Sequence, residues 1–316
     1  MGALWAICLF FAFFAVSQCT IISRKYIAKL QLGDKKSNEE LIGENNSTSV
    51  IECAARCQRG CSFFGFNPQI KNVVHTRRFS RRGYFMREVG DITHMNVFFP
   101  IDCKEIHGND YTDSGVYEIY PYGTITSLVP VYCDMTTMGG GWTAIQKRVN
   151  GSLSFDRNWT AYNNGFGAPE QDLWVGNDII HQLTKENNSF LYVSITLKDG
   201  STLYELYDRF SVSNETEKYQ LFLAGPSNGT LGDSMTNTTS YYTNLSGMLF
   251  TTSDRDNDGS MRNCAVDYGG GWWFNWCHQA FLNGPWNMAY WLYPWYPKVE
   301  SGASVRGTIM MIKRHE

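Results

Sequence analysis

The segment Asp254-Arg255-Asp256-Asn257-Asp258-Gly259 places carboxylates at alternate positions of a tight loop that contains glycine. Several hard oxygens around one point are what Ca²⁺ requires. The segment opens like an EF-hand loop, but Ala265 stands at the twelfth position, where an EF-hand needs a bidentate Glu, and no helical pattern flanks it. The sequence therefore predicts a calcium loop of a different kind, and the alternative is an acidic turn rich in Asn and Gly.

Two cysteines follow this loop and enclose an aromatic segment. Cys264 and Cys277 are close enough in sequence for a disulfide that would rigidify the residues between them. Aromatic residues fill the enclosed segment, and aromatic-lined concave surfaces suit small ligands. The alternative is that Trp272 and Trp273 are core residues, which we expect of at least one of them.

Catalytic patterns are missing. Gly232-Asp233-Ser234 lacks the flanking glycines of a serine-protease nucleophile, and the triple-glycine runs lack the Lys-Ser/Thr ending of a P-loop. His278 is better interpreted as a pocket or packing residue than as a base. The chain is therefore predicted not to be an enzyme.

The N-terminus predicts export. An uncharged apolar run covers residues 3–16 and is short for a membrane span, so residues 1–17 are predicted to be a signal peptide. A signal anchor that runs to Ile22 is disfavoured, because the nearby cations all follow the run. Cleavage after Ser17 leaves eight cysteines, whereas cleavage after Cys19 leaves seven. We expect a secreted, disulfide-bonded protein with no membrane span.

Glycosylation signals agree with an extracellular location. Nine Asn-X-Ser/Thr sequons predict a glycan-bearing surface. They begin at Asn45, Asn46, Asn150, Asn158, Asn187, Asn214, Asn228, Asn237 and Asn244.

Charge divides the chain of 316 residues into two parts. Residues 1–102 carry a net charge of +5 and residues 103–316 carry −8, and nine of the ten Trp follow residue 140. The acidic part offers no footprint for phosphate backbones, which argues against a nucleic-acid partner. We therefore expect a small module at 18–102 and a larger domain at 103–316.

The small module contains cysteines in a helical pattern. Cys53 and Cys57 would share one face of a short helix, and Cys61 follows it. With residues 62–67 this pattern resembles a PAN/apple module, although no Cys stands at 73–85, so Cys19 is a candidate partner for Cys53. A zinc site that adds His75 is the alternative. The arginine-rich run 77–82 is interpreted as a solvated loop, with a heparin-like patch or a processing site as alternatives.

The larger domain alternates short strands with Gly and Asn turns. Strands are expected at 116–120, 190–197 and 308–312, and a helix at 177–183. No Gly-X-Y tract or sustained heptad encodes a stalk. The oligomeric state and the pairing of the N-terminal cysteines stay open.

Ordered motifs of residues 103–313 resemble a fibrinogen C-terminal domain, the module of ficolins, tachylectins and fibrinogen. The resemblance implies an α+β fold with a twisted central antiparallel sheet and an irregular calcium and ligand subdomain. The matching motifs are Ser114-Gly115-Val116-Tyr117, Val131-Tyr132-Cys133-Asp134-Met135, Gly139-Gly140-Gly141-Trp142-Thr143, Leu173-Trp174-Val175-Gly176-Asn177, Gly232-Asp233-Ser234, the Asp-rich loop, Asn263-Cys264-Ala265, Leu282-Asn283-Gly284 and Met310-Met311-Ile312.

The resemblance also implies particular site residues. Ca²⁺ would be held by the side chains of Asp256 and Asp258 and by the backbone carbonyls of Ser260 and Arg262, with Asp254 supporting the loop. The implied disulfides are Cys103–Cys133 and Cys264–Cys277, and the peptide between Trp276 and Cys277 would be cis. The family pocket, which often accepts acetylated sugars or amines, would be bordered by Cys264, Tyr268, Trp276, Cys277 and His278.

Residues 285–297 depart from the family pattern, because the loop that usually completes the pocket is shorter and spaced differently. The first functional hypothesis is a secreted, calcium-dependent, lectin-like protein that binds glycans or acetylated groups. The alternative is a structural or adhesive extracellular matrix protein, or a receptor ligand, that binds protein partners.

Overall fold

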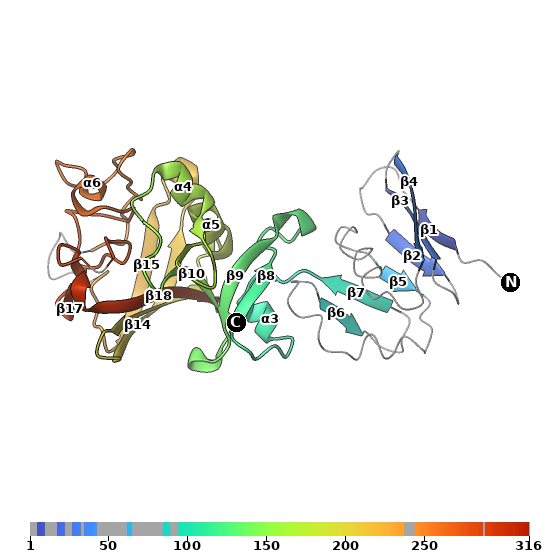
Figure 1. Ribbon diagram of the computed structural model, residues 1–316, viewed down its shortest axis with the longest axis horizontal. Coiled ribbons are helices and arrows are strands. Elements are labelled where there is room, and N and C mark those ends of the chain that lie inside the picture. The colour runs from blue at the N-terminus through green and yellow to red at the C-terminus, as the bar shows by residue number, and fades with distance from the viewer. Residues whose placement is uncertain are drawn as a thin grey trace. The chain divides into compact units, whose positions relative to one another are not determined.

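The computed structural model describes residues 99–236, 244–286 and 288–315, apart from the side chains at 125, 225 and 226. Before residue 99 it describes the backbone of seven strands, which pair as β1–β2, β3–β4 and β5–β7–β6 (Figure 1). Their bounds are β1 Trp5–Leu9, β2 Gln18–Ile22, β3 Ile27–Leu32, β4 Lys35–Ile42, β5 Ser62–Phe64, β6 Phe85–Glu88 and β7 His94–Phe98.

The chain forms two compact units, residues 1–101 with 117–130, and residues 102–116 with 131–316. The cysteine helix expected near 52–59, and with it the PAN/apple interpretation and the zinc alternative, lies outside the described residues. Of the expected signal peptide, only β1 is described. No helix in the described ranges is long and apolar enough to cross a membrane.

One large antiparallel sheet organises the second unit. Its strands follow the order β11-β12-β10-β18-β13-β14-β15, and β9 pairs with β10. The bounds are β8 Gly115–Ile119, β9 Val129–Asp134, β10 Trp142–Arg148, β11 Phe166–Gly167, β12 Leu173–Trp174, β13 Ser189–Leu197, β14 Thr202–Val212, β15 Leu221–Gly229 and β18 Val305–Arg314. The last strand of the chain therefore lies in the middle of the sheet, where it pairs with β10 and β13.

Short helices and turns accompany this sheet, and Figure 1 shows α4 and α5 beside it. Side-chain caps begin three of the helices: Asp102, Asn158 and Asn263 each accept a backbone N–H of the first turn. The α-helices are α3 Cys103–His107, α4 Trp159–Asn164, α5 Asn177–Thr184 and α6 Cys264–Tyr268. A two-stranded sheet joins β16 Leu292–Trp295 to β17 Val299–Ser301, and 3₁₀ turns span η2 Ile125–Ser127, η3 Thr137–Gly139, η4 Glu215–Glu217 and η5 Gly302–Ser304.

Aromatic side chains form much of the core. Tyr162 from α4 packs edge-to-face against Trp174 and Phe166, with ring centroids 5.4 and 5.0 Å apart. Phe250 lies 5.2 Å from Trp273 and 5.1 Å from Tyr162. Such ring pairs add to the free energy gained from burying the rings. This cluster ties α4 to the segment that carries the predicted site.

The predicted elements of the larger domain are confirmed. The expected strands coincide with β8, β13 and β18, and the expected helix coincides with α5, which extends one residue further, to Thr184. The α+β class with a large antiparallel sheet is also confirmed. Helices α3, α4 and α6 were not predicted.

Candidate functional site

Asp254 is part of the framework of the acidic loop. Its Oδ1 accepts the backbone N–H of Trp159 at 2.8 Å and the hydroxyl of Thr252 at 2.7 Å. The first bond fastens the loop to the start of α4. A carboxylate used in this way has fewer lone pairs left for a metal.

Asp256 and Asp258 lie at the exposed part of the same loop. Asp258 is half-buried, and its two oxygens accept the N–H groups of Ser260 and Cys264, both at 2.8 Å. Burial raises the pKa of Asp258, and the neighbouring Asp256 adds to that effect, while the two hydrogen bonds oppose it. Among the described residues, neither carboxylate has a cationic side-chain partner.

The backbone carbonyls assigned to calcium are also free of protein partners. Within the described ranges, the carbonyl oxygens of Ser260 and Arg262 accept no hydrogen bond. The Arg262 side chain turns to Asp267 at 3.3 Å and leaves the two loop carboxylates unpaired. Nowhere among the described side chains do three His, Cys, Asp or Glu residues cluster. Two carboxylates plus two free carbonyls are a donor set that suits Ca²⁺, a hard cation that accepts carbonyl ligands.

Both disulfides implied by the resemblance are present. Cys103 pairs with Cys133, and Cys264 pairs with Cys277. Because the N–H of Cys264 donates to Asp258, the second disulfide and the acidic loop meet at the first residue of α6. The geometry thus links the predicted metal loop to the predicted pocket.

The expectation of a cis peptide between Trp276 and Cys277 is wrong. Among the described bonds, only Tyr296–Pro297 is cis. Cys277 instead adopts a left-handed backbone with φ of 48°. The backbone N–H of Asn275 donates to the carbonyl oxygen of Cys277 at 2.9 Å, and this hydrogen bond closes the tight turn.

His278 is buried. Its Nε2 lies 3.0 Å from the carbonyl oxygen of Leu292, and its Nδ1 has no hydrogen-bond partner in the described structure. Burial lowers the pKa of His278 to about 4. The imidazole is therefore neutral at physiological pH, so that Nε2 donates to the carbonyl and Nδ1 is a buried, unused acceptor.

The other predicted pocket residues differ in exposure. Tyr268 is half-buried, and its ring meets that of His278 edge-on with centroids 4.6 Å apart. Trp276 is half exposed, Cys277 is partly exposed and Cys264 is buried. Trp272 and Trp273 are both fully buried, so both belong to the core. The structure thus brings Tyr268 and His278 together, next in the chain to the disulfide.

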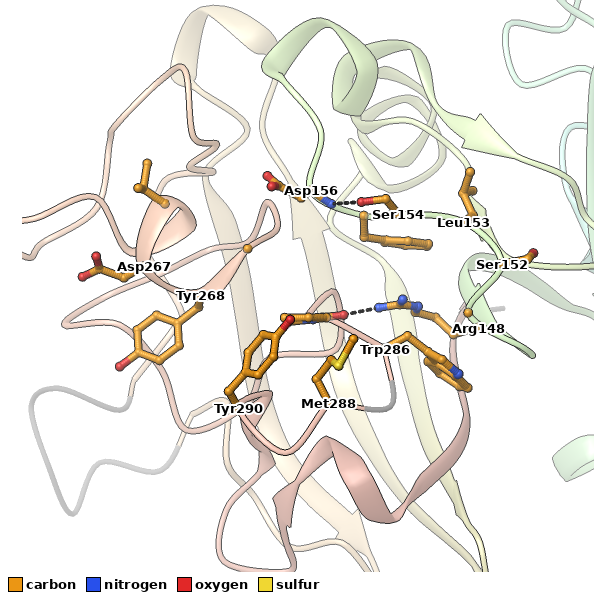
Figure 2. A pocket seen from close by; sticks show the side chains of 16 residues that line it. Arg148, Ser152, Leu153, Ser154, Asp156, Asp267, Tyr268, Trp286, Met288 and Tyr290 are labelled. Carbon is orange, nitrogen blue, oxygen red and sulfur yellow. Dashed lines mark hydrogen bonds between the residues drawn. The ribbon is translucent and has the colours of Figure 1, made fainter.

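One cavity of the described structure includes Tyr268 but none of the other predicted ligand-binding residues. We call it the Trp286 pocket; Figure 2 shows its side chains. Its volume is about 580 Å³, within the range of small-molecule sites. It is lined by Arg148, residues 151–156, residues 266–269, residues 284–286, Met288 and Tyr290.

Arg148 forms a buried wall of this pocket. Its guanidinium lies 4.3 Å from the ring centre of Phe155 and 5.0 Å from that of Trp286, and it donates to the carbonyl of Gly284. Burial lowers its pKa to about 10, opposed by nearby Asp172, so the group stays cationic. Sequence reasoning missed this residue, because Gly284 and Trp286, which it contacts, lie far away in the chain.

Most sequons of the described ranges are at the surface. Asn150, Asn158, Asn187, Asn214 and Asn228 are exposed, and Asn244 is partly exposed. The predicted glycosylation at Asn45, Asn46 and Asn237 falls outside the described residues.

The large antiparallel sheet, the acidic loop and the disulfide-clamped aromatic segment define a fibrinogen-like globular domain. The family profile for the C-terminal globular domain of fibrinogen beta and gamma chains matches residues 99–314, and the chain belongs to this family. Members of this family are non-enzymatic recognition or matrix proteins, and the chain is not an enzyme.

Individual relatives support this assignment. Mouse microfibril-associated glycoprotein 4 is 44% identical over 58% of this chain and 71% of its own length. Ryncolin-4 of Cerberus rynchops is 40% identical over 58% of this chain and half of its own length, whereas human tenascin-R is matched over only 13% of its length. The fibrinogen-like globe domain of human ANGPTL6 superimposes with a TM-score of 0.62 at 33% identity, and covers 69% of this chain and 96% of its own.

Proposed function

We propose that this chain is a secreted, calcium-dependent, lectin-like recognition protein that binds glycans or acetylated groups through its fibrinogen-like domain. The observation that supports this best is the junction at Cys264. There the acidic loop, the disulfide and α6 share one residue, and Tyr268 and His278 lie next to it. A metal bound at the loop would thereby fix the position of the pocket.

Calcium would be held by Asp256 and Asp258 and by the carbonyls of Ser260 and Arg262. The ion would supply positive charge that offsets two adjacent carboxylates, one of them half-buried. The protein's own part is to keep the loop closed, through Asp254 on α4 and through the N–H of Cys264 on Asp258.

The ligand pocket would be bordered by Cys264, Tyr268, Trp276, Cys277 and His278. Neutral His278 makes the base of this pocket uncharged, which suits an acetyl group better than an ionic one. The half-exposed Trp276 offers an aromatic surface to a sugar. We further propose secretion through residues 1–17, a separate module at 18–102, and glycosylation at the sequons.

Calcium titration and retention on resin that carries acetylated sugars test this proposal. Asp256→Ala should lower calcium affinity by more than about tenfold, or about 1.4 kcal/mol, because it removes one of two carboxylate ligands. Wild type should be retained in calcium and released by a chelator, and Asp256→Ala should not be retained. Glu300→Ala, at an exposed acidic residue of β17, is the matched control and should behave as wild type. Retention that ignores both the chelator and Asp256→Ala would contradict the mechanism.

A structural or adhesive role with protein partners is the second candidate. One relative is named as associated with microfibrils, and a lamprey fibrin fragment of this fold, at 31% identity, is solved with the peptide Gly-His-Arg-Pro-amide. A glycan and acetyl-ligand array, run with and without calcium, separates the two functions. A silent array together with localisation in an insoluble matrix would favour this second role.

A further inference from the structure

The sequence contains four Asn-Gly pairs, which begin at Asn150, Asn164, Asn228 and Asn283. Asparagine is a thermolabile residue, because the backbone nitrogen of the next residue can attack its side-chain amide. Glycine at that next position has no Cβ to obstruct the attack and leaves the backbone free to turn. The four pairs therefore share the same intrinsic reactivity, and the fold decides which of them reacts.

Burial and strand pairing protect two of these pairs. Asn283 is fully buried, its amide nitrogen donates to the carbonyl of Gly271 at 3.0 Å, and its Oδ1 accepts a hydrogen bond from Gln146. Asn228 and Gly229 lie in β15, where both are paired with β14. A ring between the side chain and the next nitrogen closes only after rotation about the Cα–C bond, and in a paired strand this rotation would break the ladder.

A helix end protects the third pair. Asn164 is exposed at the last residue of α4, but the N–H of Gly165 donates to the carbonyl of Ala161 at 2.9 Å. A Cβ on Gly165 would lie 2.6 Å from the carbonyl oxygen of Val175, so the backbone here is closely packed. The nitrogen that would attack Asn164 is thus held in a hydrogen bond, and it cannot turn toward the side chain without unwinding the end of α4.

The pair Asn150-Gly151 lies outside helices and strands, and Asn150 is exposed. In the part of the chain that the structure describes, neither the N–H of Gly151 nor the side-chain nitrogen of Asn150 donates a hydrogen bond. The backbone N–H of Asn150 is bound to Asp172, but this group takes no part in ring closure. Both the attacking nitrogen and the nitrogen that would leave are therefore free at this pair.

A hydrogen bond from Ser152 favours the attack. Its backbone N–H donates to the Oδ1 of Asn150 at 2.9 Å. The turn closed by this bond contains both the Cγ of Asn150 and the backbone nitrogen of Gly151, so it holds the electrophilic carbon near the nitrogen that attacks it. When that nitrogen bonds to Cγ, negative charge develops on Oδ1, and the N–H of Ser152 is already placed to stabilise it.

From this contrast we infer that Asn150 is a site of spontaneous deamidation in the folded protein, and that a glycan on the same side chain protects it. The inference goes beyond ligand recognition, because it assigns a chemical fate to one residue and a protective role to its glycan. Only the protective role rests on the glycosylation proposed above. The deamidation of bare Asn150 does not depend on it.

The reaction needs only water. The backbone nitrogen of Gly151 gives its proton to solvent and bonds to the Cγ of Asn150. The bond between Cγ and Nδ2 breaks, and Nδ2 takes up a proton and leaves as ammonia. Water then opens the succinimide ring: cleavage of the bond from Cγ to the nitrogen gives aspartate, and cleavage of the bond from the backbone carbonyl carbon to the nitrogen gives isoaspartate.

Both products would alter a tightly packed loop. Each adds a negative charge next to Gly151, and isoaspartate also lengthens the main chain there by one methylene group. Gly151 lies against Trp286, since a Cβ at this position would come within 1.8 Å of the indole ring. A glycan on Nδ2 prevents the change, because the leaving group would then be a bulky glycosylamine in place of ammonia.

Peptide mapping by mass spectrometry, after incubation of full-length folded protein in neutral and mildly alkaline buffer, tests the inference. Ser152→Ala removes the sequon at Asn150 but keeps the backbone N–H of residue 152. In this variant, Asn150 should become aspartate and isoaspartate at least about tenfold faster than Asn164 and Asn283. The rate should rise with pH, because the attacking nitrogen must lose its proton.

Thr230→Ala is the matched control, because it removes the sequon at Asn228 in the same way. Bare Asn228 in β15 should be as slow as Asn164. In denaturant all four pairs should react at similar rates, which would show that the fold protects the other three. In wild type, deamidated Asn150 should occur only in chains without a glycan at that residue.

Equal rates at the four pairs in the folded protein, or faster loss at Asn164 than at Asn150, would overturn the inference. Equal deamidation of Asn150 in wild type and in Ser152→Ala would overturn the protective role of the glycan. Calcium and added glycans take no part in this test, so its result is independent of the recognition function proposed above.

Discussion

The side chain of His278 lies among the rings of Tyr268, Phe274 and Phe281, with centroids 4.6 to 5.7 Å away. Among the described residues, its only polar contact is with the carbonyl of Leu292. An imidazolium here would lose hydration without gaining an anionic partner, which is the physical reason for the low pKa. The residue therefore contributes to the pH dependence of folding.

Stability should fall as the solution is acidified. The folded pKa of His278, about 4, lies below the ordinary value of 6.5, so the unfolded chain binds the extra proton first. The contribution of neutral His278 to the free energy of unfolding is complete above about pH 6.5 and is lost as pH falls toward about 4. Between about pH 7 and about pH 5, the loss should be about 1–2 kcal/mol. Denaturant unfolding at both pH values measures it.

His278→Phe should show a flatter pH profile, because it keeps a ring in the cavity and removes the titrating group. Equal pH profiles for wild type and His278→Phe would mean that other groups dominate.

Sites whose residues are neighbours in the sequence could be predicted from it, and sites whose residues are distant in the sequence could not. The acidic loop could be predicted because its carboxylates alternate within six residues. Arg148 gave no signal, since the groups that surround it come from Phe155, Asp172, Gly284 and Trp286. Only the folded sheet brings these segments together.

At the level of elements, α6 joins the acidic loop to the disulfide. Asn263 caps the helix by accepting the N–H of Val266 at 3.1 Å, and its amide donates to the carbonyl of Thr252 at 3.0 Å. Cys264 then donates to Asp258. The start of this helix is thus held by hydrogen bonds to Thr252 and Asp258, and the disulfide connects it to Cys277.

Removing this disulfide should weaken calcium binding. In Cys264→Ser/Cys277→Ser, the N–H that orders Asp258 is no longer restrained, and we expect calcium affinity to fall by about tenfold, or about 1.4 kcal/mol. Stability should fall as well, since a disulfide closing a loop of this size contributes about 3 kcal/mol. Calorimetric calcium titration and thermal unfolding measure both effects.

The matched control is Cys103→Ser/Cys133→Ser. It should lower the unfolding temperature while calcium affinity stays at the wild-type value, because that disulfide joins α3 to β9 and has no part in the acidic loop. Equal calcium affinities in wild type and both double variants would show that α6 does not link the Cys264–Cys277 disulfide to calcium binding.

Strands of the domain were easier to foresee than its helices. β13 and β18 carry long runs of apolar and β-branched residues, whereas α3, α4 and α6 have five or six residues each, too few for helical periodicity. Their caps, Asp102, Asn158 and Asn263, were the available signal. The module expected at 18–102 stays a prediction, because its cysteine pattern falls on residues outside the described ranges.

At the scale of the whole molecule, exposed sequons recur along the larger domain, from Asn150 to Asn228. Asn158 also begins α4, where its Oδ1 accepts the N–H of Ala161 at 3.0 Å, and Asn214 begins η4 in the same way. In each case the oxygen serves the backbone, and the amide nitrogen, the atom that carries a glycan, is left for modification. Capping and glycosylation are therefore compatible at one side chain.

Full-length chain expressed in a secretory eukaryotic host should reach the medium with residue 18 as its N-terminus, as N-terminal sequencing would show. Removal of N-glycans should lower its mass by several glycan units. Asn158→Asp and Asn158→Gln should each lose one unit, but only Gln should also destabilise α4, by about 1 kcal/mol, because Asp retains the capping oxygen. Chain that stays membrane-bound with residues 1–17 attached would show instead that the apolar run is an anchor, and an unchanged mass after deglycosylation would contradict the glycan-bearing surface.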